Sequence, residues 1–290
     1  MPWFMSGVRQ GFFEVDNPYS RRTTRVPAGP EQVHSIVFNS KDFGAFLKNG
    51  YGEKLAQQGY GLFFNFTINS PHPVLEPRVP ALGARLAQLA ELCRRYGPAC
   101  VQWRFDPICH FRSPDGQVET NLACFDQIAA AAAEAGLTSC VSSFADLYGK
   151  VRRRLKTASG LELFDPPLPQ KIECTLELQR RLADRGLGLR LCCEKEVLAA
   201  LPLFSPVAEA HCIPSERLAA LYGPDISRRR DPGQRAAAGC GCGISRDIGS
   251  YDRHPCRHDC LYCYANPSCD GRLRAESGSA EMVHDAHRIH

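Results

Sequence analysis

Three cysteines near the C-terminus have the type and spacing of metal ligands. Cys256, Cys260 and Cys263 form a C-x3-C-x2-C pattern, and Tyr262 stands directly before the last of them. Thiolates are soft ligands that prefer thiophilic metals. Three thiolates from one short loop can bind three irons of a cubane 4Fe–4S cluster and leave the fourth iron open to an external ligand. The spacing therefore favours an iron–sulfur site, and an open iron is a site for chemistry.

Structural zinc is the alternative for the same three cysteines, because zinc accepts thiolates at similar spacing and completes a tetrahedron with a fourth ligand. The residues near enough in sequence to supply that ligand are Cys240, Cys242, Cys269, His254 and His258. The C-x3-C-x2-C spacing and the aromatic residue before the third cysteine favour iron–sulfur. The spacing alone leaves zinc open.

Cys240 and Cys242 are separated by a single glycine, and their role has several interpretations. They could provide a fourth ligand, which would close the open iron, or they could bind a second metal. A redox role and simple packing are the other two interpretations. Gly239, Gly241 and Gly243 allow the backbone to approach other groups closely.

The composition is that of an ordinary globular protein. Of the 290 residues, 44% are hydrophobic and 23% are charged, which is enough apolar material for one large domain with its own core. The formal net charge is only +4 and no basic run is long, so the charge does not indicate a nucleic-acid partner. No stretch is apolar and long enough to span a bilayer, and the N-terminus does not resemble a signal peptide. The 15 cysteines do not suit a small secreted disulfide framework, so we expect a reducing cytoplasm.

Apolar runs of strand length alternate with segments of helical periodicity. The predicted strands are Val33–Asn39, Gly61–Ile68, Cys100–Ile108, Thr138–Phe144, Leu187–Glu194 and Glu209–Ile213. The predicted helices cover residues 43–55, 80–97, 122–136 and 170–184, with a short one from Pro214. Six β-then-α units in a row indicate an α/β fold with a parallel sheet. No Gly-x-Gly-x-x-Gly motif follows a strand, so we predict a partial or complete (β/α) barrel rather than an open doubly wound sheet.

In a (β/α) barrel, polar residues at the carboxyl ends of the strands face the active site. The residues that meet this condition are Asn39, Asn65, Thr67, Arg104, Asp106, Ser142, Glu194 and His211. Among them, Arg104, Asp106 and Glu194 are the candidate catalytic residues. Arg104 could bind a carboxylate or phosphate through two parallel hydrogen bonds, and an ion pair with Asp106 is the alternative. Cys192 and Cys193 alternate faces within a strand, so we expect that they do not both face the pocket and that at least one is in the core.

The sequence predicts three segments. Residues 1–223 form the barrel domain. From residue 224 the residues Arg, Asp, Gly and Cys dominate, and residues 224–270 are predicted to be a cysteine-rich iron–sulfur segment packed on the barrel. Residues 271–290 are polar and without periodicity, which is typical of a disordered tail.

Several stretches of the chain match one known family. They are Trp3-Phe4-Met5, Asn17-Pro18-Tyr19, Ile36-Val37-Phe38, Trp103-Arg104-Phe105-Asp106-Pro107, Ser143 to Tyr148, Cys240 to Cys242, Ser245 to Gly249 and Cys256 to Asn266. Through them the sequence resembles an uncharacterised, mainly bacterial domain-of-unknown-function family, whose C-terminal cysteine cluster looks like that of radical S-adenosylmethionine (SAM) enzymes. Relatives usually begin with an additional strand that carries Ser-Arg-Arg-Thr-Asp, and we expect that barrel strand to be missing from this chain.

The resemblance implies that Cys256, Cys260 and Cys263 hold a 4Fe–4S cluster whose open iron binds SAM. It also implies that Tyr262 lies against the adenine of SAM. In such enzymes the reduced cluster cleaves SAM, and the resulting 5′-deoxyadenosyl radical abstracts hydrogen from a substrate while the protein orients the cofactor. Because the cysteine motif follows the last strand rather than the first, we expect it to fold back over the barrel mouth.

Asp247 and Tyr251 lie in the cysteine-rich segment, where they either contact the cofactor or order the loop. The first functional hypothesis is a cytoplasmic radical SAM-type enzyme of unknown substrate, served by an electron donor such as a flavodoxin or ferredoxin. The second is a non-catalytic barrel protein whose C-terminal segment is stabilised by structural zinc or a closed iron–sulfur cluster. A third, nucleic-acid processing, rests only on the small positive charge.

Overall fold

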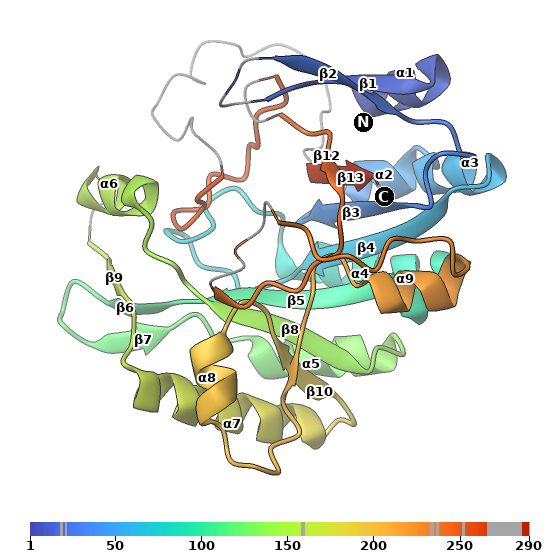
Figure 1. Cartoon of the computed structure of the whole chain (residues 1–290). Helices are drawn as coiled ribbons and strands as arrows, with labels where there is room; N and C mark the ends of the chain where they lie inside the picture. Colours follow the sequence, from blue (N-terminus) through green and yellow to red (C-terminus); the bar gives the residue numbers. More distant parts are fainter. Residues whose placement is uncertain are drawn as a thin grey trace.

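A sheet with six parallel strands forms the centre of the computed structural model (Figure 1). The structure describes residues 1–17, 20, 22–157, 160–232, 235, 238–250, 253–265 and 286–289. From one edge to the other, the parallel strands are β11 (Ala208–Glu209), β10 (Gly188–Leu191), β8 (Ser139–Phe144), β5 (Val101–Ile108), β4 (Gly61–Thr67) and β3 (Ser35–Ser40). Beyond β3, the strands β13 (Ala286–Ile289) and β12 (Arg246–Asp247) continue the sheet with antiparallel pairing. All six predicted strands are therefore present.

The predicted (β/α) barrel is wrong, because the sheet is open in the part of the chain that the structure describes. A barrel requires the first and last parallel strands to pair with each other. Here β3 pairs with β13 on its outer side, and β11 is an edge strand beside β10. The six strands follow one another across the sheet in chain order, as they would in a barrel. The alternation of strands and helices along the sequence is thus the same for both folds and does not reveal closure.

Helices cover one face of the sheet, and aromatic side chains fill the space between the two layers. These helices are α2 (Gly44–Lys48), α3 (Tyr51–Gln57), α4 (Leu82–Tyr96), α5 (Phe125–Glu134), α7 (Leu168–Ala183) and α8 (Lys195–Ala200). Phe38 of β3 stacks on Phe64 of β4 with ring centroids 5.5 Å apart, and Phe43 meets Phe66 at 5.0 Å. Burial of each such ring contributes roughly 1.5–3 kcal/mol. The predicted helix over residues 43–55 is two helices, because Gly50 between them has a φ of +60°.

The opposite face of the sheet carries a row of amides that holds the chain after β11. Asn65 of β4 donates to Asn39 Oδ1 at 2.9 Å, and Gln102 of β5 donates to Asn65 Oδ1 at 2.8 Å. Asn65 also donates to the Cys212 carbonyl oxygen at 2.8 Å, and Gln102 to that of His211 at 3.2 Å. Buried amides require such partners. The segment after β11 therefore occupies the face that side chains of the opposite strands would fill in a barrel.

Smaller elements surround the sheet. They are α1 (Pro2–Gln10) beside the hairpin of β1 (Phe12–Asp16) and β2 (Thr23–Pro27), the antiparallel sheet of β7 (Val118–Thr120), β6 (His110–Arg112) and β9 (Glu162–Phe164), the helices α6 (Gly149–Thr157) and α9 (Ser215–Tyr222), and the 3-10 turn η1 (Pro98–Cys100). Among the described residues, no helix combines the length and the apolar character needed to cross a membrane.

The chain after residue 224 packs against what precedes it. Cys240 and Cys242 lie against Val37 and Phe63, on the same face as the row of amides. Ile248 joins the aromatic core on the other face. Of the predicted tail over residues 271–290, the structure describes only residues 286–289, which form β13.

Candidate functional site

Two cavities adjoin at the carboxyl edge of the parallel strands. The first has a volume of about 360 Å³, and its wall includes all three cysteines of the C-x3-C-x2-C motif. The second has a volume of about 200 Å³ and is lined by five cysteines: Cys192, Cys193, Cys212, Cys240 and Cys242. The residues that line both cavities are Arg104, Asp106, Cys212, Tyr262 and Tyr264. The strand-end residues Asn39, Thr67, Arg104 and Asp106 line these cavities, whereas Asn65, Ser142 and His211 are not in the lining of either one. Their place in an active site stays a prediction.

Residues 256–263, the cysteine loop, are held on the segment that follows β4. The backbone N–H of Leu261 donates to the Leu75 carbonyl oxygen at 3.0 Å, and the backbone N–H of Arg78 donates to the His258 carbonyl oxygen at 3.3 Å. Asp259 has a left-handed φ of 57°, a conformation that Asp tolerates better than most residues. This turn lets the loop direct its cysteines to the first cavity.

The three thiols of the cysteine loop differ in burial. Cys260 is buried, whereas Cys256 and Cys263 are half-buried. The thiols of Cys256 and Cys263 interact electrostatically with that of Cys260. Burial raises the pKa of Cys260 to about 12, against the opposing effect of the Lys41 ammonium. Within the described residues, no three or more His, Cys, Asp or Glu side chains are arranged so as to hold a metal ion.

Tyr262 is fixed by a buried network behind the cysteine loop. Its hydroxyl donates to the carboxylate of Glu76 and accepts a hydrogen bond from Asn69 at 3.0 Å. The ammonium of Lys41 lies 5.4 Å from the centroid of the ring. The ring lines both cavities although only 8% of the residue is exposed. The predicted contact between Tyr262 and the adenine of SAM stays a prediction.

Glu76 is a buried carboxylate between two cations. Its Oε1 lies 2.9 Å from Lys41 Nζ, and its Oε2 lies 3.8 Å from Arg85 Nη1. Burial opposes ionisation of Glu76, but Lys41, Tyr262 and Arg85 together lower its pKa below the ordinary value. Burial also opposes the charge of Lys41, and Glu76 outweighs it and raises the pKa of Lys41. A fixed ammonium therefore stands in the wall of the first cavity.

Arg104 and Asp106 form an ion pair at the end of β5. Nη2 of Arg104 donates to Asp106 Oδ2, and Nε lies 3.2 Å from the same oxygen. The other oxygen of Asp106 accepts from the hydroxyl of Ser143, and the backbone N–H of Asp106 donates to Asn69 Oδ1 at 2.8 Å. Nη1 of Arg104 is buried and has no hydrogen-bond partner among the described residues. The ion pair of Arg104 with Asp106 is thus present, and binding of a carboxylate or phosphate by Arg104 stays a prediction.

The five cysteines of the second cavity, here called the cysteine ring, touch one another through their side chains. Sγ of Cys192 lies 3.9 Å from that of Cys193 and 3.8 Å from that of Cys212. Side-chain contacts of Cys240 with Cys193 and Cys242, and of Cys242 with Cys212, complete the ring. The expectation that Cys192 and Cys193 do not both face a pocket is wrong. The strand β10 ends at residue 191 and Cys193 has a φ of 60°, so strand alternation does not extend to them, although Cys192 is buried as expected.

Three glycines shape the backbone that carries Cys240 and Cys242. Gly239 has a φ of +87°, which favours glycine. A Cβ on Gly241 would lie 2.2 Å from Cε1 of His211, and a Cβ on Gly243 would lie 2.0 Å from the Ser215 hydroxyl oxygen. The alternation of glycine and cysteine is therefore required for this segment to lie close against the loop after β11.

The remaining predicted site residues have different surroundings. Glu194 does not line either of these two cavities among the described residues. It precedes α8 and accepts a hydrogen bond from the Phe144 N–H at 2.8 Å, and burial raises its pKa to about 7. Asp247 of β12 lines the first cavity. Tyr251 lies outside the described residues.

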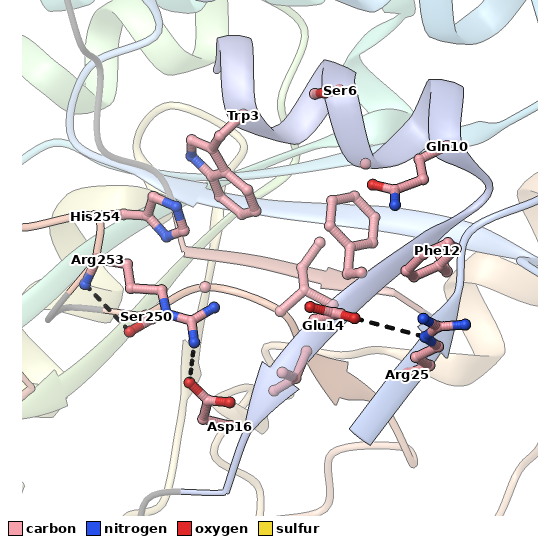
Figure 2. A pocket seen from close by; sticks show the side chains of 15 residues that line it. Trp3, Ser6, Gln10, Phe12, Glu14, Asp16, Arg25, Ser250, Arg253 and His254 are labelled. Carbon is pink, nitrogen blue, oxygen red and sulfur yellow. Dashed lines mark hydrogen bonds and ion pairs between the residues drawn. The ribbon is translucent and has the colours of Figure 1, made fainter. Parts of the chain in front are cut away.

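The segment before the cysteine loop is held by the N-terminal part of the chain (Figure 2). The indole of Trp3 in α1 stacks on the imidazole of His254, with ring centroids 3.8 Å apart and an interplanar angle of 14°. The guanidinium of Arg253 pairs with the carboxylate of Asp16 in β1. These residues line a third cavity, of about 430 Å³. Burial lowers the pKa of His254, which favours a neutral stacking partner.

Lys41, Cys212 and Glu76 belong to the site but were not among the predicted site residues. Lys41 directly follows β3 and Cys212 follows β11, so the rule that selected Arg104 from its strand end could have found both. Glu76 lies in a loop with no periodic pattern, and no sequence signal marked it.

Comparison with known families places the chain in one of them. The family model described as "Domain of unknown function (DUF1848)" matches residues 1–265, so the chain belongs to this family. The match includes the cysteine loop and the cysteine ring. No curated protein matches the chain. Membership of a domain-of-unknown-function family is confirmed, and the likeness of its cysteine cluster to that of radical SAM enzymes stays a prediction.

Proposed function

We propose that this member of the DUF1848 family uses Cys256, Cys260 and Cys263 to hold a 4Fe–4S cluster whose open iron faces the first cavity and binds SAM. The observation that carries the proposal is the presence of all three thiols, from one short loop, in the wall of one cavity. Three thiolates leave one iron of such a cluster without a protein ligand. When bound and reduced, a cluster of this kind supplies the electron that cleaves SAM and so begins hydrogen abstraction from a substrate.

The charges around the first cavity suit the methionine part of SAM, which carries a carboxylate and an amino group. Arg104 keeps Nε and Nη2 on Asp106, and its buried Nη1 has no hydrogen-bond partner among the described residues, so a carboxylate that reaches it on binding would satisfy this donor. Lys41 adds a second positive charge, held in place by Glu76. Asp247 supplies an acidic side chain at the same cavity. Charge-assisted hydrogen bonds of this kind give both affinity and orientation.

The unoxidised thiols support a reducing compartment, and we propose that this compartment is the cytoplasm. Four cysteines of the cysteine ring, Cys192, Cys193, Cys240 and Cys242, are free thiols although their side chains touch one another. Thiols in contact would be oxidised readily outside a reducing environment. The proposed reaction also needs an external electron donor, such as a flavodoxin or ferredoxin.

The first experiment is anaerobic purification followed by an absorption spectrum and by iron and sulfide analysis. About four irons and four sulfides per chain would support the cluster. Replacing Cys256, Cys260 or Cys263 by Ala should remove both, whereas the matched variant Cys174→Ala, on α7, should keep them. 5′-Deoxyadenosine formed after addition of dithionite and SAM would support the radical reaction.

Two results would contradict the proposal. A colourless protein without sulfide, whose zinc is lost when Cys260 is replaced by Ala, would favour a structural zinc site in the cysteine loop. An iron–sulfur protein that neither binds nor cleaves SAM would favour a closed, non-catalytic cluster.

The role of Arg104 is tested separately by SAM binding. Arg104→Gln should raise the Kd for SAM about tenfold, the effect of losing about 1.5 kcal/mol from a charged hydrogen bond. Iron and sulfide contents should stay unchanged. Arg112→Gln, at an exposed ion pair with Glu162, is the control. Equal SAM affinities for the two variants would exclude Arg104 from the SAM site.

A further inference from the structure

We propose that the cysteine ring is a second metal site, in which four of its five thiolates bind one soft divalent cation, Zn²⁺ or Fe²⁺, in tetrahedral geometry. The site is distinct from the cysteine loop, and the proposal does not depend on SAM binding. The thiols come from three separate segments: residues 192 and 193 after β10, residue 212 after β11, and residues 240 and 242.

The sulfur spacing points to a single ion. Sγ of Cys192 lies 3.8 Å from that of Cys212 and 3.9 Å from that of Cys193. A Zn–S distance of about 2.3 Å gives an S–S edge of about 3.8 Å in a tetrahedron. Thiolates bound to different irons of a cluster stand further apart, because cluster atoms lie between them. Because no three such side chains of the described residues are already arranged around one point, the proposal requires the cysteine side chains to rotate about χ1 when the ion binds.

Charges around the cysteine ring complement a four-thiolate centre, which carries a net charge of −2 with a divalent ion. The guanidinium of Arg104 interacts electrostatically with Cys192 and Cys212, and that of Arg235 does so with Cys193. Arg235 is held by Asp146 and by the Tyr148 hydroxyl, which lies 2.9 Å from its Nη1. Each guanidinium is also paired with an aspartate, Arg104 with Asp106 and Arg235 with Asp146, so the two cations offset only part of the charge of buried thiolates.

A backbone donor also serves the cysteine ring. The N–H of Cys212 donates to Sγ of Cys242 at 3.2 Å. Hydrogen bonds to ligand atoms orient and stabilise them in metal sites. Cysteines that serve only as small hydrophobes pack against apolar side chains. Cys240 and Cys242 do pack against Val37 and Phe63, but the five thiols also touch one another and line a cavity with Arg104 and Asp106, which apolar packing does not require.

The test uses a variant in which the three thiols of the cysteine loop are removed together by Cys256→Ala, Cys260→Ala and Cys263→Ala. This triple variant, prepared anaerobically, is titrated with Co²⁺ as a coloured probe for thiolate coordination. We expect one Co²⁺ per chain with a sulfur-to-metal charge-transfer band, and displacement of Co²⁺ by Zn²⁺. Adding Cys240→Ala and Cys242→Ala should abolish the band, whereas adding Cys93→Ala and Cys174→Ala should leave it. Failure of the triple variant to bind Co²⁺, or binding that survives loss of Cys240 and Cys242, would overturn the proposal.

A second measurement on the unmodified chain covers the case in which the triple variant does not fold, as judged by circular dichroism. Anaerobic alkylation followed by peptide mass spectrometry should show that Zn²⁺ protects Cys212, Cys240 and Cys242 but not Cys174. Equal labelling with and without Zn²⁺, or a disulfide between Cys192 and Cys212 in anaerobic protein, would refute the site. Metal analysis of the purified protein then distinguishes zinc from iron. Because one ion brings no sulfide, the sulfide content reports on the cysteine loop alone.

Discussion

The ion pair between Arg104 and Asp106 stands in the wall common to both cysteine-lined cavities. Both side chains come from β5 and lie two residues apart, so they share one face of the sheet. Asp106 accepts hydrogen bonds from Nε and Nη2 of Arg104, and Nη1 of Arg104 is buried without a hydrogen-bond partner among the described residues. The pair therefore lies between the two proposed metal sites, and we expect a change of charge at one site to alter the electrostatic potential at the other.

Asp106→Asn should lower the free energy of unfolding by about 2 kcal/mol, because Arg104 would remain buried with weakened hydrogen bonds. Urea unfolding measures the change. Glu162→Gln, which breaks an exposed pair with Arg112, is the control and should change stability by less than about 0.5 kcal/mol. Similar effects of the two substitutions would mean that the Arg104–Asp106 pair has no special role in the fold.

Tyr262→Phe should destabilise the chain by about 1–3 kcal/mol, because Glu76 and Asn69 lose a buried hydrogen-bond partner. The iron content should not change, since the ring stays in place beside the cysteine loop. Tyr51→Phe, on α3, is the matched control. A Tyr262→Phe protein as stable as the control would show that the buried network does not anchor the loop.

Glu194 should make stability depend on pH. Burial raises its pKa from 4.5 to about 7, so the folded chain binds a proton that the unfolded chain has lost between those values. The stability that protonation of Glu194 contributes is therefore fully present below pH 4.5 and is lost as the pH rises through about 7. Glu194→Gln keeps the acceptor for the Phe144 N–H and should flatten this part of the profile. Identical slopes of unfolding free energy against pH in the two proteins would contradict the assignment.

Gly241→Ala should disturb the cysteine ring, because its Cβ would lie 2.2 Å from the imidazole of His211. We expect a lower melting temperature, and we expect Co²⁺ binding to be lost when Gly241→Ala is added to the triple variant Cys256→Ala, Cys260→Ala and Cys263→Ala. Gly83→Ala is the control, since Gly83 lies in α4 with nothing within 4 Å of a Cβ, and it should be neutral or stabilising by up to about 1 kcal/mol. Retention of Co²⁺ binding by Gly241→Ala would show that the close approach is not needed.

The sequence predicts the six parallel strands and the helices α4, α5 and α7, because each of these has a local pattern, but it does not predict α1, α6, α8 or the smaller antiparallel strands. The stripe of Leu82, Leu86, Leu89 and Cys93 marks α4, whose end coincides with Gly97 and its positive φ. Closure of the sheet has no such pattern. It depends on what covers the inner face, and here the amides of Asn65 and Gln102 bind the chain after β11 instead of facing further strands.

The candidate site also has one part that a local sequence pattern predicts and one part that it does not. Cys256, Cys260 and Cys263 are close in sequence, so their spacing alone indicates that they act together. The cysteine ring joins three segments that only the sheet and the backbone after β11 bring into contact, and spacing alone left Cys240 and Cys242 ambiguous. Glu194 was placed at a cavity because the predicted strand extended to it, whereas β10 ends at Leu191.

The stacking of Trp3 on His254 has a consequence for biosynthesis. Helix α1 is made long before its partner His254, and contacts between such distant segments form late. The six parallel strands are all made before His254 and can assemble before then. The cysteine loop, which follows directly after His254, takes its final position only after translation has passed it. Loading of the proposed cluster would therefore follow assembly of the parallel strands.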